Sequence, residues 1–272
     1  MSDTWRPDFA ATPPFAPYRP LADRLAGPGW PTLAQLEKLA RAGDLRNARG
    51  LPLAFTAQTQ RCGQRDYEAT ILETGRVPTR EGNWHDLCNA LVWLAWPRTK
   101  AALNAFQCRQ LHPGAPRNPA SDAATLFDES GLLLAGPHPE LVRLLAEGQW
   151  REALVERREA WRDMSVVVLG HALLEKLLAP WPAITAKCLY LPVERTEPAS
   201  LDRALAAFWE RGDDAMRPAR LFPLPVLGVP GWWADNENPD FYADRNIFRS
   251  RNQACTLTGG VLQASPGAVG TS

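Results

Sequence analysis

The chain has 272 residues, of which 45% are hydrophobic and 11 are Trp, so it can bury a substantial core and is not disordered as a whole. Its 30 Lys and Arg residues balance 30 Asp and Glu residues, which does not favour nucleic acid as a partner, because dedicated nucleic-acid binders usually carry a basic excess. The sequence shows neither a long apolar run nor a secretory signal, and its five cysteines lack C-x-x-C spacing, which predicts no membrane partner, reduced thiols and a cytoplasmic location.

The first 20 residues are rich in Pro and aromatic side chains, which predicts an extended arm held down by its rings. Residues 21–249 are expected to form a single domain, and residues 250–272 a flexible tail with little to pack against. In the first half the sequence predicts a helix from Thr32 to Ala42, a strand from Leu51 to Ala57, a helix from Asp66 to Gly75, a loop at 76–82, and helices at 84–96 and from Pro97 to Phe106.

The second half begins with a predicted hairpin, in which residues 123–128 and 132–135 are strands joined by a turn at Ser130-Gly131. The Pro- and Gly-rich stretch 224–233 is expected to be an ordered extended loop. The remaining predicted elements are helices at 139–147, 150–164, 171–178 and 201–211, and strands at 165–169 and within 184–193. Together these elements predict a helix-rich α+β domain with a small mixed β-sheet that includes one hairpin.

The segment from Asn83 to Trp96 has the most informative pattern. Asn83 is a good helix N-cap, and at about 100° per residue the leucines fall on one side of the helix. The opposite arc carries His85, Asp86, Asn89, Trp93 and Trp96. Since Lys and Glu would be usual on a surface helix, this arc favours the wall of a partly buried polar pocket, with Asn89 and Trp93 as substrate contacts.

Several motifs of the chain occur together in one known family. They are Asn83-Trp84-His85-Asp86, Asn89-Ala90-Leu91-Val92-Trp93-Leu94, Pro97-Arg98-Thr99-Lys100, Leu103-Asn104, Glu73-Thr74-Gly75-Arg76-Val77-Pro78-Thr79-Arg80, Asp128-Glu129-Ser130-Gly131, Gly170-His171-Ala172-Leu173-Leu174-Glu175-Lys176 and Leu224-Pro225-Val226-Leu227-Gly228-Val229-Pro230-Gly231-Trp232. The chain resembles a bacterial family catalogued as a domain of unknown function, the one numbered 3025, over about residues 20–249. The resemblance implies a single domain and carries no activity, ligand or catalytic residue.

Two histidines lie at the starts of predicted helices, each with a carboxylate near it. His85 is followed by Asp86, and His171 shares a helix face with Glu175 four residues on. Asp128 ends a predicted strand, where adjacent residues point to opposite faces, so that at most one of Asp128 and its neighbour can join a site. We expect these five residues to converge on one cleft. The alternatives are that Asp86 only stabilises its helix start, the His171–Glu175 pair is a surface contact, and Asp128 serves its own turn.

The sequence lacks the P-loop, dinucleotide-binding, zincin and nucleophile-elbow motifs. Our leading hypothesis is a hydrolase that uses either acid/base chemistry without a cofactor or metal-assisted chemistry with a divalent metal ion, and the sequence leaves this choice open. Arg98 and Lys100 would then bind a small-molecule substrate that carries phosphate or another anionic group. A gap of more than ~12 Å between His85 and His171 would rule this out. The alternatives are a non-catalytic binding protein that uses the Trp-rich face of residues 84–96, and local nucleic-acid binding through the arginines around Arg98 and Lys100.

Overall fold

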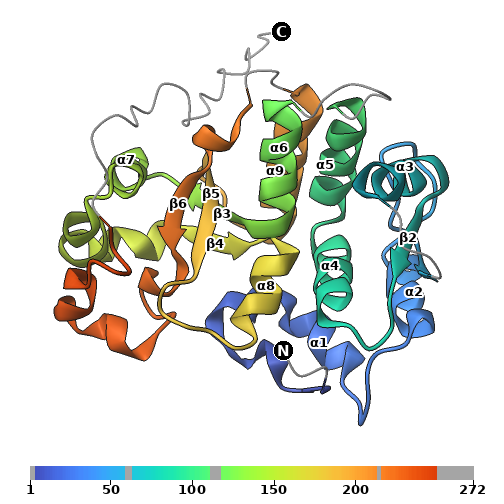
Figure 1. Ribbon diagram of the computed structural model, residues 1–272, viewed down its shortest axis with the longest axis horizontal. Helices are drawn as coiled ribbons and strands as arrows, with labels where there is room; N and C mark the ends of the chain where they lie inside the picture. Colours follow the sequence, from blue (N-terminus) through green and yellow to red (C-terminus); the bar gives the residue numbers. More distant parts are fainter. Residues whose placement is uncertain (1–3, 59–62, 111–117, 213–215, 250–272) are drawn as a thin grey trace, which may run out of the picture.

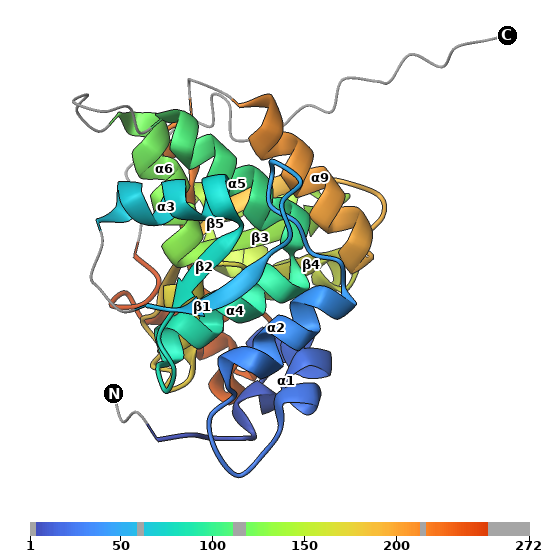
Figure 2. The same ribbon diagram turned by 90° about the vertical axis from the view of Figure 1, so that its right-hand side faces the viewer.

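A central group of helices separates a four-stranded mixed sheet from a two-stranded parallel sheet in the computed structural model (Figure 1), which describes residues 4–58, 63–110, 118–212 and 216–249. The four-stranded sheet has the order β4-β3-β5-β6. Figure 2 shows the β1–β2 pair lying over α4. The strands are β1 Ala54–Ala57, β2 Arg76–Thr79, β3 Gly131–Gly136, β4 Ser165–Val168, β5 Thr185–Pro192 and β6 Phe222–Pro225. The predicted helix-rich α+β fold is confirmed.

The helices begin and end at residues whose local chemistry the sequence displays. Thr32 caps α2 with a full capping box, Asn83 accepts a hydrogen bond from the Asp86 amide at the start of α4, and Gly75 ends α3 with φ 72°. None of the described helices is both long and apolar enough to cross a bilayer. The helices are α1 Arg19–Leu25, α2 Leu33–Ala42, α3 Gln64–Thr74, α4 Trp84–Ala95, α5 Pro97–Gln110, α6 Pro119–Ser130, α7 Pro139–Glu147, α8 His171–Leu177 and α9 Pro198–Arg211.

Strand β3 is the centre of the larger sheet. All six of its residues are buried, and it pairs in parallel with β5 and antiparallel with β4. At one edge, β6 pairs antiparallel with β5 although it contains Pro223 and Pro225. Proline lacks an amide donor and is therefore tolerated at a sheet edge, so the expected extended loop over 224–233 begins inside a short edge strand.

The predicted hairpin is wrong. Residues 119–130 form the helix α6, and the chain passes directly from this helix into β3. Asn118 caps the helix by accepting from the Ser121 amide, and Pro119 occupies its first turn. These start signals and tertiary packing outweigh the strand propensity of Thr125-Leu126-Phe127.

Two other segments of regular structure also differ from expectation. The predicted loop at 76–82 begins with β2, which pairs in parallel with β1. The predicted helix over 150–164 is replaced by a π-helical turn at Glu152–Glu156 and a 3-10 helix at Arg158–Asp163. Because β2 is only four residues long and contains Pro78, its composition alone resembles a turn.

The N-terminal segment is not an extended arm. Two 3-10 helices, Phe9–Ala11 and Pro13–Tyr18, lead into α1, and the rings of Phe15 and Tyr18 are fully buried. The Tyr18 hydroxyl donates to the Val168 carbonyl over 2.5 Å, which attaches this segment to β4. Its aromatic rings therefore anchor the segment as predicted, but they do so as part of the main core. The expected tail, 250–272, lies outside the described residues.

Candidate metal centre

Two imidazole rings meet at the junction of α4, α6 and α8. His85 is the second residue of α4 and His171 is the first of α8. Their Nε2 atoms are 3.0 Å apart, and the Glu129 carboxylate from the end of α6 places Oε2 3.6 Å from His171 Nε2. The ligand atoms of these three residues all lie within 4.8 Å of one another. The convergence expected for the two histidines is therefore present in the fold.

Two glycines allow the backbone to make this junction. Gly170 links β4 to α8, and its amide donates to the carbonyl of Gly131, which links α6 to β3, over 2.8 Å. A Cβ atom at position 170 would lie 2.4 Å from the Gly131 nitrogen and 2.6 Å from the Glu129 carbonyl oxygen. Only glycine therefore lets the two turns approach closely enough to place His171 beside Glu129.

A carboxylate faces the outer nitrogen of each imidazole. Glu175 Oε2 lies 3.0 Å from His85 Nδ1, and Asp128 Oδ2 lies 3.6 Å from His171 Nδ1, a buried nitrogen with no hydrogen-bond partner among the described residues. Both carboxylates favour the tautomer that carries its proton on Nδ1. The two Nε2 lone pairs then face each other across 3.0 Å, an arrangement that a shared cation would stabilise.

The distances suit a transition-metal ion. Zinc–imidazole bonds are about 2.0–2.1 Å long, which places two nitrogens on one ion roughly 2.9–3.4 Å apart for angles between square and tetrahedral. Burial lowers the pKa of His171 to about 3, so its ring is neutral and can act as a ligand at pH 7. Burial, and then the neighbouring Asp128 charge, raise the pKa of Glu129. A cation at this point would offset that destabilised negative charge.

Comparison with known proteins places this junction within one family. The profile of a family described as a protein of unknown function (DUF3025) matches residues 53–252. The chain belongs to this family. Searches of curated proteins and of solved structures found no match. The DUF3025 match begins after the N-terminal segment and α2, and it includes every residue named at the imidazole junction.

A buried ion pair lies next to the imidazole junction. Lys100 Nζ, from α5, donates to Asp128 Oδ1, and the ammonium also lies 5.5 Å from the centre of the Trp93 ring. Burial alone would raise the pKa of the Asp128 carboxyl, but the Lys100 charge, with a contribution from His171, holds it below its ordinary value. Lys100 therefore stabilises a buried carboxylate and does not present an anion-binding group to solvent.

Glu68 of α3 is a second buried carboxyl beside this ion pair. Asn104 Nδ2 donates to its side chain over 2.7 Å and to its backbone carbonyl over 3.0 Å. Burial, and then the Asp128 charge, raise the pKa of Glu68 to about 7, whereas Lys100 and Asn104 act in the opposite direction. A carboxyl with this pKa can take up and release a proton near neutral pH.

Replacing Glu68 by Gln is expected to change the free energy of unfolding more favourably at pH 8 than at pH 5. In the unfolded chain Glu68 ionises near pH 4.5, and in the folded chain near pH 7, so its contribution to stability is present at acid pH and lost as pH rises through 7. The difference is roughly 2–3 kcal/mol in the free energy of unfolding. Urea unfolding at both pH values measures it. Glu73→Gln, an exposed change on the same helix, is the control and is expected to show no such pH dependence.

A cavity of about 270 Å³ opens beside the imidazole junction. Four carboxyl groups and one guanidinium line it, and two of the carboxylates are paired with Arg80 and Lys100. Two of the lining residues, Asn89 and Gln107, each have a buried polar atom, Oδ1 and Nε2 respectively, with no hydrogen-bond partner among the described residues. The charged lining residues are Glu68, Asp86, Asp128, Glu129 and Arg80.

Two further residues predicted for the site, Asp86 and Asn89, also line this cavity; the Asp86 carboxylate is fully paired, and Asn89 is bonded through its nitrogen. Both Asp86 oxygens accept from Arg80, through the Arg80 amide at 2.6 Å and its guanidinium at 2.8 and 2.9 Å. Asn89 Nδ2 donates to the Tyr67 hydroxyl over 2.8 Å. Asp86 therefore positions Arg80. It also stands in the first turn of α4, where the alternative interpretation had it stabilise the helix start.

The anion-binding prediction for Arg98 and Lys100 is wrong for this cavity. Arg98 lies in a different groove, and Lys100 is buried against Asp128. Trp93 and Trp96 are each about 1% exposed, so the Trp-rich interaction face proposed for residues 84–96 is not a surface. The expectation that only one of Asp128 and Glu129 joins the site is also wrong, because both lie at the end of a helix and approach opposite nitrogens of His171.

Sequence reasoning missed several cavity residues that come from distant parts of the chain. Glu129 was assigned to a hairpin turn, and Glu68 lies on a helix of low amphipathicity with no local sign of burial. The only signal in the sequence was that Arg80 and Glu129 stand in the family motifs. Membership in a motif does not indicate which residues are in contact in space. The residues missed are Tyr67, Glu68, Arg80, Gln107 and Glu129.

Proposed function

We propose that this protein is a metal-dependent hydrolase. Its divalent ion would be held by His85 Nε2, His171 Nε2 and the Glu129 carboxylate, with Glu175 and Asp128 orienting the two rings. The observation that carries the proposal is the 3.0 Å separation of two Nε2 atoms whose Nδ1 atoms face carboxylates. Two histidines and a glutamate leave a fourth coordination position for water, as in other catalytic zinc sites.

The chemistry follows from the ion and the neighbouring carboxyls. A bound divalent metal ion supplies a water of lowered pKa and polarises a carbonyl oxygen. Glu68 lines the same cavity, so it would accept the proton as the water oxygen bonds to the carbonyl carbon. Glu68 would then pass the same proton to the leaving nitrogen or oxygen as its bond to carbon breaks.

The cavity favours an uncharged polar substrate over a phosphate. The one guanidinium in the lining, that of Arg80, is already bound by both oxygens of Asp86, so it is not free to hold an anion. Asn89 Oδ1 is a buried acceptor and Gln107 Nε2 a buried donor without a partner, and a substrate amide that displaced neighbouring side chains would satisfy both through its N–H and C=O. We therefore infer that the hydrolysed bond is an amide or ester, and that the anionic substrate suggested by Arg98 and Lys100 is disfavoured.

Titration with Zn²⁺ followed by calorimetry and elemental analysis tests the metal site. We expect one ion per chain, and a loss of affinity of more than about 100-fold in His85→Gln and Glu129→Gln, since outer-shell changes alone typically cost 10–100-fold. His138→Gln is the matched control, because His138 is not part of the three-residue cluster and pairs with Asp163; this variant is expected to bind Zn²⁺ as the unchanged protein does. Failure to bind Zn²⁺, or an equal loss in the control, would contradict the proposal.

The substrate part is checked with chromogenic esters, aminoacyl amides and a phosphomonoester, assayed with the zinc-loaded protein. Turnover of an amide or ester is expected, with a loss in Glu68→Gln although that variant still binds Zn²⁺. Turnover of the phosphomonoester alone would retain the metal centre and overturn the substrate class.

A further inference from the structure

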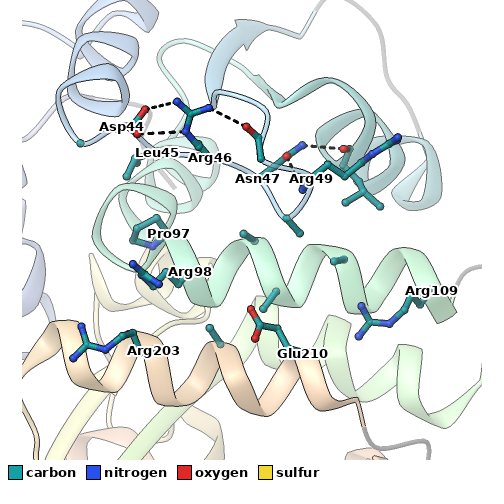
Figure 3. A pocket seen from close by; sticks show the side chains of 18 residues that line it. Asp44, Leu45, Arg46, Asn47, Arg49, Pro97, Arg98, Arg109, Arg203 and Glu210 are labelled. Atoms are coloured by element: carbon teal, nitrogen blue, oxygen red, sulfur yellow. Dashed lines mark hydrogen bonds and ion pairs between the residues drawn. The ribbon is translucent and has the colours of Figure 1, made fainter.

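A larger cavity of about 980 Å³ lies elsewhere, between the loop 43–50 and the helices α5 and α9 (Figure 3). The floor of this groove is formed by small side chains on the two packed helices, so the floor is apolar and no long side chain projects from it. Three small residues of the loop, Gly43, Ala48 and Gly50, line the opposite wall between longer polar ones. The floor residues are Ala101, Ala102, Ala105 and Ala206.

Arginines surround this floor. Five of them line the groove against two acidic residues, Asp44 and Glu210, although the chain as a whole has no net charge. The described residues provide no hydrogen bond or ion pair for the guanidinium groups of Arg49 and Arg98. Arg46, by contrast, is paired with Asp44 and donates to the Gly50 carbonyl. The five arginines are Arg46, Arg49, Arg98, Arg109 and Arg203.

The loop wall of the groove is held in place by a buried side chain. Asn47 Nδ2 donates to the Ile71 and Leu72 carbonyls over 2.8 Å, and its Oδ1 accepts from the Arg49 and Leu51 amides. On the helical side, Asp202 of α9 accepts from the Arg98 and Thr99 amides at the start of α5. Both walls are therefore fixed before any ligand binds, which lowers the entropic cost of binding.

We propose that this groove binds an acidic peptide segment of a partner protein in an extended conformation. Arg98 and Arg109 stand eleven residues apart on α5, about 16 Å along the axis, which is the length of about five extended residues. Guanidinium forks pair with carboxylates in a bidentate manner. Glu210 would face a basic or polar residue of the same peptide.

The lining also distinguishes a peptide from a nucleic acid. Single-stranded nucleic acids bind largely by stacking their bases on aromatic side chains, and the lining of this groove contains none. Asp44 and Glu210 would also repel a uniformly charged phosphate backbone. The groove shares no lining residue with the cavity at the proposed metal centre, and its loop wall precedes the segment that matches the family.

Fluorescence anisotropy with labelled peptides of about ten residues, graded in Asp and Glu content, tests this proposal. Affinity is expected to rise with acidic content and to fall between about 50 and 200 mM salt. The double variant Arg98→Ala/Arg203→Ala is expected to bind about tenfold more weakly, since it loses two exposed guanidinium groups that would pair with peptide carboxylates. Arg162→Ala, a change of an exposed arginine outside the groove, is the matched control and should leave affinity unchanged.

Three results would overturn the proposal. They are affinity that does not depend on acidic content, an equal loss of binding in Arg162→Ala, and tighter binding of a single-stranded oligonucleotide of similar length than of the most acidic peptide. Both substituted side chains are exposed, so the double variant is expected to fold. Thermal unfolding checks that it does.

Discussion

Substituting Ala for Gly170 is expected to lower the free energy of unfolding by roughly 2–3 kcal/mol and to weaken metal binding at the imidazole junction. The added Cβ would lie 2.4 Å from the Gly131 nitrogen and 2.6 Å from the Glu129 carbonyl oxygen. Both contacts are with backbone, so no change of rotamer can relieve them. The turn before α8 would have to move away from the end of α6, which separates His171 from Glu129.

Urea unfolding measures the loss of stability, and Zn²⁺ titration of the folded fraction measures the effect on the site. Gly29→Ala is the matched control, because a Cβ at that position would meet nothing within 4 Å and its backbone is not in the left-handed region. The control should unfold within about 0.5 kcal/mol of the unchanged protein. If Gly170→Ala were as stable as Gly29→Ala, the close approach of the two turns would not be what determines the junction.

The helix boundaries could be predicted because their determinants are local. Thr32, Asn83 and Pro97 act on backbone groups within one turn, so the sequence alone indicates where each of these helices begins. The expected proximity of His85 and His171 rests on similar logic, since both follow residues that start a helix. Strand pairing has no such local signal, and for this reason the sequence did not predict β2.

The polar interior could not be predicted for a different reason. Lys100 follows the start of a helix and looks like a solvated charge, because its partner Asp128 is 28 residues away and was assigned to a strand. Once residues 119–130 are recognised as a helix, Asp128 and Glu129 lie at its last turn, beside both the lysine and His171. One wrong element therefore hid both the third ligand candidate and the buried ion pair.

The Lys100–Asp128 pair leads to the second large prediction. Lys100→Met retains the length of the side chain but leaves the Asp128 carboxylate buried without its cation, which typically costs 3–5 kcal/mol. Without Lys100, desolvation would raise the pKa of Asp128 above its ordinary value. The folded variant would then bind protons more readily than the unfolded chain, so its deficit should be larger at pH 8 than at pH 5. Urea unfolding at the two pH values measures this difference.

The double variant Lys100→Met/Asp128→Asn shows whether the pair itself is responsible. Without a charge at either position, it should recover a large part of the lost stability and lose the added pH dependence. Lys38→Met, on the exposed face of α2, is the control for removal of a lysine and should have almost no effect. A double variant no more stable than Lys100→Met would show that the lysine acts through another group. Glu68 is then the first candidate, because Lys100 also lowers the pKa of that carboxyl.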